Sequence, residues 1–291
     1  MTAMDCPKIL REVNLEYANS YRLASTCEEL LLPRCADDVA EMFERGGAAS
    51  FPILGHGSNV ILSRTRYPRV MKFGRRFGAV TRLAEHVVYA DAGASLRRVG
   101  LACERFGLAG FEVLGNIPGS VGGGIVMNAG AFGDDISSVV QSVRVYAIHT
   151  RQVIELDRSE CEWGYRSSGF QHGAYVVLGA YFRLHDGDPH ELRIRRLANL
   201  ALRRERFPGS EPNAGSVFKR PAHGMKIGEM IEALGHKGLT IGTARISPKH
   251  AGFIVVRRPG RANDICQLID FMRSEMWKHF NVEAEVEQRI L

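Results

Sequence analysis

The sequence predicts an α+β fold, and three observations support this class. Runs rich in β-branched and aromatic residues, which are typical of strands, lie at 86–94, 139–148 and 175–184. Apolar residues recur at helical spacing from Asp264 to Phe280, which predicts a long helix packed on a core. Glycine-rich segments, which are typical of ligand-binding loops, separate such elements.

The first predicted domain, 1–75, is small and ends in a loop. Residues 30–33 are expected to form an apolar strand and residues 36–45 a short helix. The segment FPILGHGSN at 51–59 then passes from a strand into a glycine-rich loop.

The second predicted domain, 76–188, holds the three strands, a helix over 96–106 and a longer glycine-rich segment. Segment 110–133 has ten glycine or alanine residues among its 24 positions. Glycine clusters persist where φ must be positive or where a ligand approaches too closely for a Cβ. Backbone NH groups in successive turns also bind anions. Tight turns with close strand packing are the simpler alternative.

The third predicted domain, 189–291, begins with a helix near Pro189. Its densest basic segment, 191–206, is expected to present a solvated basic face. A helix over 226–234, a strand within AGFIVV at 251–256 and the long helix follow. Near the end, three alternating glutamates would share one solvated face if their segment forms a strand: Glu283, Glu285 and Glu287.

Composition limits the possible partners. With 291 residues, 45% of them hydrophobic, the chain can bury a substantial core. The net charge of +6 favours anionic ligands, but no RNA-binding signature supports nucleic acid as a partner. No apolar stretch resembles a signal peptide or a membrane span, so we expect a cytoplasmic protein that does not insert into membranes. We also expect a monomer. The six cysteines show no metal-ligand spacing, so no metal is expected.

Neither glycine-rich segment matches a familiar nucleotide motif. Gly122-Gly123-Gly124 is followed by Ile125, which excludes a P-loop. The spacing around Gly55 does not fit the dinucleotide fingerprint of a Rossmann domain. Two such loops in one chain predict one large phosphate-bearing ligand held in another way.

Two polar residues beside turns are candidates for chemistry. Arg166, in CEWGYRSSGF, is suited to clamp a carboxylate or a developing oxyanion, or else to form a surface ion pair. Ser216, in PNAGSVFKRP, is either a proton donor or a local hydrogen-bonding residue of the turn.

Five segments, in this order, resemble the UDP-N-acetylenolpyruvoylglucosamine reductase family: LGHGSNVIL, IPGSVGGGIVMNAGAFG, GYRSSGF, NAGSVFKRP and KGLTIGTARISPKHAGFIV. The resemblance extends from about Asn19 to Ile290. It implies an FAD enzyme that uses NADPH to reduce UDP-N-acetylglucosamine enolpyruvate to UDP-N-acetylmuramate in bacterial cell-wall synthesis. It also implies an FAD-binding fold of the vanillyl-alcohol-oxidase type, completed by a third, substrate-binding domain. The short interval 170–213 resembles the subgroup without an extra substrate-capping insertion.

The resemblance further implies that FAD lies along both glycine-rich loops and is bound mainly by backbone NH groups. The implied cofactor-binding residues are Leu54, Gly55, His56, Gly57, Ser58, Asn59, Ile117, Pro118, Gly119, Ser120, Gly122, Gly123, Asn128 and Gly130.

For catalysis the resemblance implies three residues. Arg166 would polarise the enolpyruvyl carboxylate and stabilise the enolate, Ser216 would protonate C2, and Glu287 would assist Arg166. A two-residue shift would select Glu285 in place of Glu287. The implied substrate-binding residues are Tyr165, Arg206, Lys219 and Arg220.

The chain also departs from the family pattern. Gln288 stands where valine is usual, and together with the short remainder up to Leu291 this predicts weak bracing of Glu287. Two other functions remain open: an FAD oxidoreductase of the same fold with a different substrate, and a non-catalytic protein that binds nucleic acid through its basic face.

Overall fold

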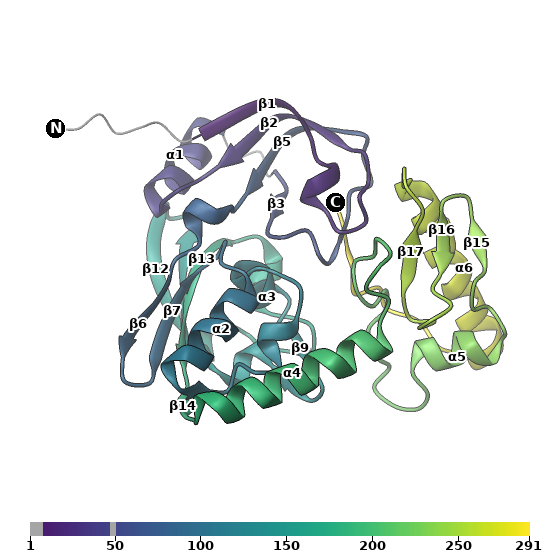
Figure 1. Ribbon diagram of the computed structural model, residues 1–291. Coiled ribbons are helices and arrows are strands. Elements are labelled where there is room, and N and C mark those ends of the chain that lie inside the picture. The colour runs from purple at the N-terminus through teal and green to yellow at the C-terminus, as the bar shows by residue number, and fades with distance from the viewer. Residues whose placement is uncertain (1–7, 47–50) are drawn as a thin grey trace. The chain divides into compact units, whose positions relative to one another are not determined.

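The computed structural model describes residues 8–46 and 51–291 (Figure 1). Cys6 and the start of the first predicted domain lie outside these ranges. The chain divides into two compact units, each assembled from segments that are distant in sequence. The first unit comprises Met1–Arg11, Glu29–His56 and Arg69–Ala201. The second comprises Glu12–Glu28, Gly57–Pro68 and Leu202–Leu291. The domain boundaries at 75 and 188 stay predictions.

A four-stranded sheet contains the first strands of the chain. Its order is β1 (Lys8–Asn14), β2 (Thr26–Leu32), β5 (Arg66–Lys72) and β3 (Ile53–Leu54). Strand β3 runs parallel to β5, and the first glycine-rich loop begins where β3 ends. The predicted helix at 36–45 is confirmed as α1 (Ala36–Gly46).

A five-stranded antiparallel sheet forms the centre of the first unit. Its order is β12 (Gln152–Asp157), β11 (Val140–Ala147), β13 (Tyr175–Arg183), β7 (Val87–Asp91) and β6 (Val80–Ala84). The three strands predicted from β-branched runs are β7, β11 and β13, and all are confirmed. They lie side by side and contribute to one continuous core; alternate residues are buried in β7, whereas β11 and β13 are buried at most of their positions.

Helices α2 (Leu96–Phe106) and α3 (Val121–Val126) contact this sheet (Figure 1). Ser95 begins α2, since its hydroxyl accepts a hydrogen bond from Arg98 N at 3.1 Å. Gly107, at φ 68°, ends it in the left-handed conformation that glycine adopts without strain. Two short antiparallel pairs complete the unit: β8 (Leu108–Ala109) with β14 (His185–Asp186), and β9 (Gly130–Ala131) with β10 (Asp134–Asp135).

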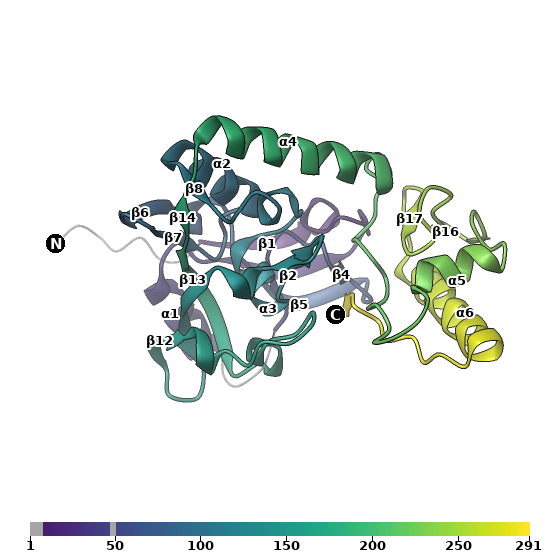
Figure 2. The ribbon, with the colours of Figure 1, turned by 90° about the horizontal axis from the view of Figure 1, so that it is seen from below.

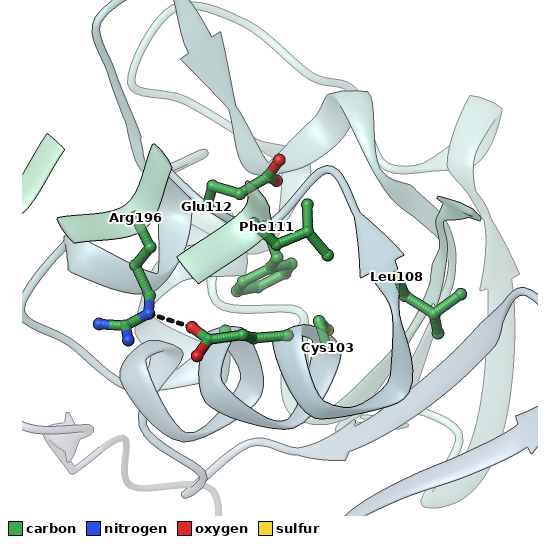
Figure 3. A pocket seen from close by; sticks show the side chains of 8 residues that line it. Cys103, Leu108, Phe111, Glu112 and Arg196 are labelled. Carbon is green, nitrogen blue, oxygen red and sulfur yellow. Dashed lines mark hydrogen bonds and ion pairs between the residues drawn. The ribbon is translucent and has the colours of Figure 1, made fainter. Parts of the chain in front are cut away.

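Helix α4 (Pro189–Arg206) follows, and Figure 2 shows it alongside α2. The expectation that its basic residues are solvated is wrong for Arg196, which is only 9% exposed. Its Nε lies 2.6 Å from Glu104 Oε2 on α2. Figure 3 shows this pair beside the side chains of Cys103 and Phe111, at a cavity of about 10 Å³, roughly the room that one water needs. A charge that forms a buried ion pair cannot be recognised from helical spacing alone.

The second unit holds a three-stranded antiparallel sheet that packs against one helix, and a second helix packs against the first. The strands are β15 (Thr240–Ile241), β16 (Ala244–Ile246) and β17 (Ile254–Val256), and the helices are α5 (Ile227–Ala233) and α6 (Ala262–Phe280). The predicted core positions of α6 are confirmed as buried: Ile265, Leu268, Met272 and Met276.

The segment that holds the three C-terminal glutamates does not form a regular strand. Only β18 (Arg289–Ile290) is a strand, and it pairs in parallel with β4 (Val60–Ile61). The three glutamates lie in irregular backbone, where Glu283 and Glu285 are exposed and Glu287 is half-buried. They do not share one strand face, because the segment bonds to other parts of the chain one residue at a time. Among the described residues, no helix is both long and apolar enough to span a bilayer.

The ion pair between Arg196 and Glu104 predicts unequal roles for two neighbouring arginines. We expect Arg196→Met to cost about 3–5 kcal/mol and to lower the Tm by about 10 °C, because Glu104 loses its buried partner. Arg195, whose side chain is 62% exposed, provides the matched control, and Arg195→Met should cost less than about 1 kcal/mol. Differential scanning calorimetry measures both values. Equal shifts for the two variants would contradict the structural role of the pair.

Candidate functional site

The first glycine-rich loop is shaped by two glycines. A Cβ on Gly55 would lie 2.1 Å from Ser120 Oγ, so a larger residue would collide with the second loop. Gly57 has a φ of 68°, and a Cβ there would lie 2.2 Å from Ala18 O. Ser20 N donates to Gly57 O at 2.9 Å. The loop therefore has a defined course, which it holds through backbone contacts.

Lys72, at the end of β5, contributes a positive charge to this loop. Its Nζ donates a hydrogen bond to Gly55 O, and no carboxylate among the described residues forms an ion pair with it. Burial lowers the pKa of Lys72 to about 8. Burial and the nearby Lys72 also lower the pKa of His56. A half-buried ammonium without a counter-ion is costly and favours an anionic ligand. Lys72 is not among the residues predicted from the sequence; its signal there is a lysine in the apolar run 70–73.

The second glycine-rich loop, 117–123, is bonded to the end of β7. Val121 N donates to Ala94 O at 2.8 Å, and Gly122 N donates to Ala92 O at 2.9 Å. Ser120 begins α3, because its Oγ accepts from Gly123 N at 3.3 Å. The two loops therefore meet where Gly55 approaches Ser120. The ammonium of Lys72 bonds to the carbonyl of the same glycine.

Arg166 lies in a two-residue turn closed by hydrogen bonds between Gly164 and Ser167. It adopts a φ of 53°, and its guanidinium donates to Gly130 O at 2.5 Å and Asn128 O at 3.5 Å. The buried Asn128 side chain donates to Gly164 O at 2.9 Å and accepts from Ser137 N at 3.2 Å. Asn128, predicted to bind the cofactor, thus also holds the turn that carries Arg166.

Gln171 holds the same turn from its other side. Its Nε2 donates to Arg166 O at 3.1 Å and to Val126 O at 3.0 Å. Tyr165 is 54% exposed, and the Arg166 guanidinium lies 5.1 Å from the centre of its ring. Gln171 is not among the residues predicted from the sequence, since a glutamine in a polar turn has no distinctive spacing.

In the second unit, Ser216 and Glu287 lie on neighbouring stretches of backbone. Ser216 pairs with Phe253 in an isolated antiparallel bridge. The next residue, Val217, accepts a hydrogen bond from Glu287 N at 2.8 Å. Asn59 Nδ2 donates to Glu287 O at 3.2 Å. A predicted cofactor residue and two predicted catalytic residues are therefore connected through the backbone of the second unit.

The expectation of weak bracing around Glu287 is wrong. Arg289 N donates to Asn59 O at 2.9 Å, and Leu291 N donates to Ile61 O at 3.0 Å. Gln288 is 4% exposed and bonded through its side chain. The segment is short, but long-range hydrogen bonds that the sequence does not reveal hold it in place.

The predicted substrate-binding residues of the second unit differ in their surroundings. Lys219 Nζ lies 2.6 Å from Glu285 Oε1, and Lys219 N donates to Glu285 O at 2.9 Å. Arg206 and Arg220 are exposed. Glu285, the alternative to Glu287, is thus already an ion-pair partner, with a side chain that is 68% exposed.

The candidate residues therefore fall into two groups. The first unit holds Leu54, Gly55, His56, Ile117, Pro118, Gly119, Ser120, Gly122, Gly123, Asn128, Gly130, Tyr165 and Arg166. The second unit holds Gly57, Ser58, Asn59, Arg206, Ser216, Lys219, Arg220 and Glu287. The described residues contain no cluster of three histidine, cysteine, aspartate or glutamate side chains suited to a metal ion.

Comparison with known proteins gives one consistent result. Residues 28–156 match an FAD binding domain, and residues 207–291 match the C-terminal domain of UDP-N-acetylenolpyruvoylglucosamine reductase. The reductase of Francisella tularensis is 34% identical over 282 residues, 96% of this chain and 99% of that protein. The reductase of Clostridium beijerinckii is 35% identical over 280 residues, covering 93% and 88% respectively.

A solved structure supports the same relationship. The crystal structure of the Thermus caldophilus reductase is similar with a TM-score of 0.83 at 26% identity, and the match covers 98% of this chain and 99% of that one. The predicted fold, an FAD-binding region followed by the family's C-terminal domain, is confirmed.

The close approach of Gly55 to Ser120 predicts a measurable coupling. In Gly55→Ala the new Cβ should force the Ser120 hydroxyl out of its capping position, at a cost of about 1 kcal/mol and about 2–4 °C in Tm. In a Ser120→Ala background that hydroxyl is absent, so the same Gly55→Ala change should cost much less. Thermal unfolding of both single variants and the double variant gives the coupling. Strict additivity would show that the two loops do not meet as described.

Proposed function

The chain belongs to the UDP-N-acetylenolpyruvoylglucosamine reductase family, and from this premise we propose how Arg166, Ser216 and Glu287 share its reaction. It is an FAD-dependent oxidoreductase, a UDP-N-acetylmuramate dehydrogenase of peptidoglycan precursor synthesis, with NADPH as co-substrate. Bound FAD supplies hydride transfer between NADPH and the enolpyruvyl group of UDP-N-acetylglucosamine enolpyruvate. The roles of individual residues are the proposal.

The observation that carries the cofactor assignment is the meeting of the two glycine-rich loops at Ser120, next to Lys72. An ammonium that forms no ion pair with a described carboxylate, held at a glycine-rich loop, suits an anionic dinucleotide. We assign FAD binding to 54–59 and 117–123, with Asn128 and Gly130. These residues fit FAD chemically, because the negative charge of its diphosphate would pair with the ammonium of Lys72.

We assign to Arg166 the stabilisation of negative charge on the substrate. Its guanidinium is fixed by two backbone carbonyls, so it needs little reorganisation when an enolate develops at the substrate carboxylate. Glu287 would assist Arg166 in this role. Glu287 N donates to Val217 O, directly after Ser216, and this position supports Glu287 as the catalytic carboxylate.

We assign to Ser216 the delivery of a proton to C2 of the substrate. A hydroxyl is a weak acid, so the position of its proton matters more than its pKa. Gly215, at φ 82°, and the bridge to Phe253 set the backbone on both sides of this serine. Tyr165, Arg206, Lys219 and Arg220 would bind the substrate and its diphosphate. We further propose a cytoplasmic monomer of the subgroup without the capping insertion.

Replacing Ser216 should affect one half-reaction only. In Ser216→Ala, oxidation of the reduced flavin by the enolpyruvyl substrate should slow by about 10²–10⁴-fold, whereas flavin reduction by NADPH should change less than about twofold. Anaerobic stopped-flow absorbance measures the two steps separately. Ser210→Ala, at an exposed serine of the same unit, is the control and should match the wild type. Parallel slowing of both steps would remove Ser216 from its proposed role.

Replacing Glu287 and replacing Glu285 should change different kinetic constants. We expect Glu287→Gln to lower kcat by about 100-fold or more, because a charge that acts in the transition state is lost. Glu285→Gln should mainly raise KM, through release of Lys219 from its ion pair. Steady-state kinetics on both variants gives the comparison. The reverse pattern would move the catalytic role to Glu285.

A further inference from the structure

The Gln288 side chain contacts the turn that carries Ser216. Its Nε2 donates to Ala214 O and to Gly215 O, each at 3.1 Å. These are the two residues that directly precede Ser216 in the chain. The Gln288 side chain is almost fully buried, and all of these groups belong to the second unit. One side-chain amide therefore binds the carbonyls of both residues that directly precede Ser216.

Tyr21 sets the orientation of that amide. Its hydroxyl lies 3.0 Å from Gln288 Oε1, and the tyrosine is fully buried. Burial raises the pKa of Tyr21, so the hydroxyl stays protonated and donates to Oε1. Because backbone carbonyls only accept hydrogen bonds, the NH₂ group must face Ala214 and Gly215. No flipped amide satisfies both ends of this chain of hydrogen bonds.

Tyr21 is itself held by its own turn. The Asn19 side chain, 1% exposed, donates to Leu15 O at 2.9 Å and to Leu23 O at 3.1 Å, and it accepts from Leu23 N at 3.0 Å. The hydroxyl of Tyr21 therefore belongs to an ordered, buried segment. A fully satisfied buried network specifies one arrangement of the groups in it.

The same C-terminal segment bonds to the chain after Ser216 as well. Glu287 N donates to Val217 O at 2.8 Å, and Val286 pairs with Phe218. Ser216 is thus fixed from both sides by residues 286–288. Main-chain hydrogen bonds hold the residues after Ser216, and the Gln288 side chain holds the two residues before it.

We propose that Gln288, oriented by Tyr21, is a positioning residue for the hydroxyl of Ser216. This inference rests on the proposed role of Ser216 as proton donor. Without the amide, the carbonyls of Ala214 and Gly215 lose their shared donor, and the left-handed Gly215 can relax. A displacement of about 1 Å at a reacting group costs about 100-fold in rate.

The test separates proton delivery from the rest of catalysis. In Gln288→Met, which keeps length but removes the amide, flavin oxidation by the enolpyruvyl substrate should slow by about 10- to 100-fold. Its solvent deuterium isotope effect should increase, because proton transfer becomes more rate-limiting. Flavin reduction by NADPH should change less than about twofold. Gln267→Met, at an exposed glutamine of α6, is the matched control and should behave as wild type.

A second variant tests the orientation. Tyr21→Phe removes only the donor to Oε1, and it should slow the same half-reaction by about 3- to 10-fold with the same change in isotope effect. The double variant should be no slower than Gln288→Met alone, since both changes disable one network. Circular dichroism spectra and Tm values of all variants show whether each one folds.

Three results would overturn the inference. Equal slowing of flavin reduction and flavin oxidation in Gln288→Met would show that Gln288 has a general structural role. A normal rate and isotope effect in Gln288→Met would show that the amide does not position Ser216. If Ser216→Ala itself leaves flavin oxidation unchanged, the proposed role of Ser216 fails, and this inference fails with it. A slow Ser216→Ala beside a normal Gln288→Met would overturn the inference alone.

Discussion

The second unit depends on one set of long-range hydrogen bonds, those made by the last residues of the chain. Residues 285–288 bond to 214–219, and residues 289–291 bond to 59–63. Without these bonds, the segment of the candidate carboxylate would lose its connection to the segments that hold Ser216 and Asn59. Ordering such a segment costs entropy, and backbone pairing on two sides offsets that cost without a regular strand.

In the first unit, close packing orders the irregular backbone of the glycine-rich loops. Its two glycine-rich loops approach each other at Gly55 and Ser120 more closely than side chains would permit. The five-stranded sheet anchors the second loop through Ala92 and Ala94, at the end of β7. Rigid elements thus present flexible sequence in one conformation, which is the usual way a loop becomes a binding site.

Local pattern predicted the regular elements well, for a physical reason. The helices α2 and α6 and strand β7 bury residues at the period of their own structure, and β11 and β13 are short apolar runs buried at most positions, so a short window contains the signal. The same reasoning misjudged Arg196 and could not determine the backbone of the glutamates at 283–287. The partner of Arg196 is 92 residues away in the chain, and irregular backbone has no period.

The sequence by itself determined the fold class, the glycine-rich loops and, through the order of its motifs, the family and the cofactor. These follow from residue type and spacing, which local conformational preference and ligand chemistry impose directly. Only the tertiary structure decided that Lys72 lies at Gly55, that Gln171 holds Arg166, and that Tyr21 and Gln288 lie beneath Ser216. A buried polar side chain is defined by its partner, and partners that are brought together by folding leave no mark in the spacing of either residue.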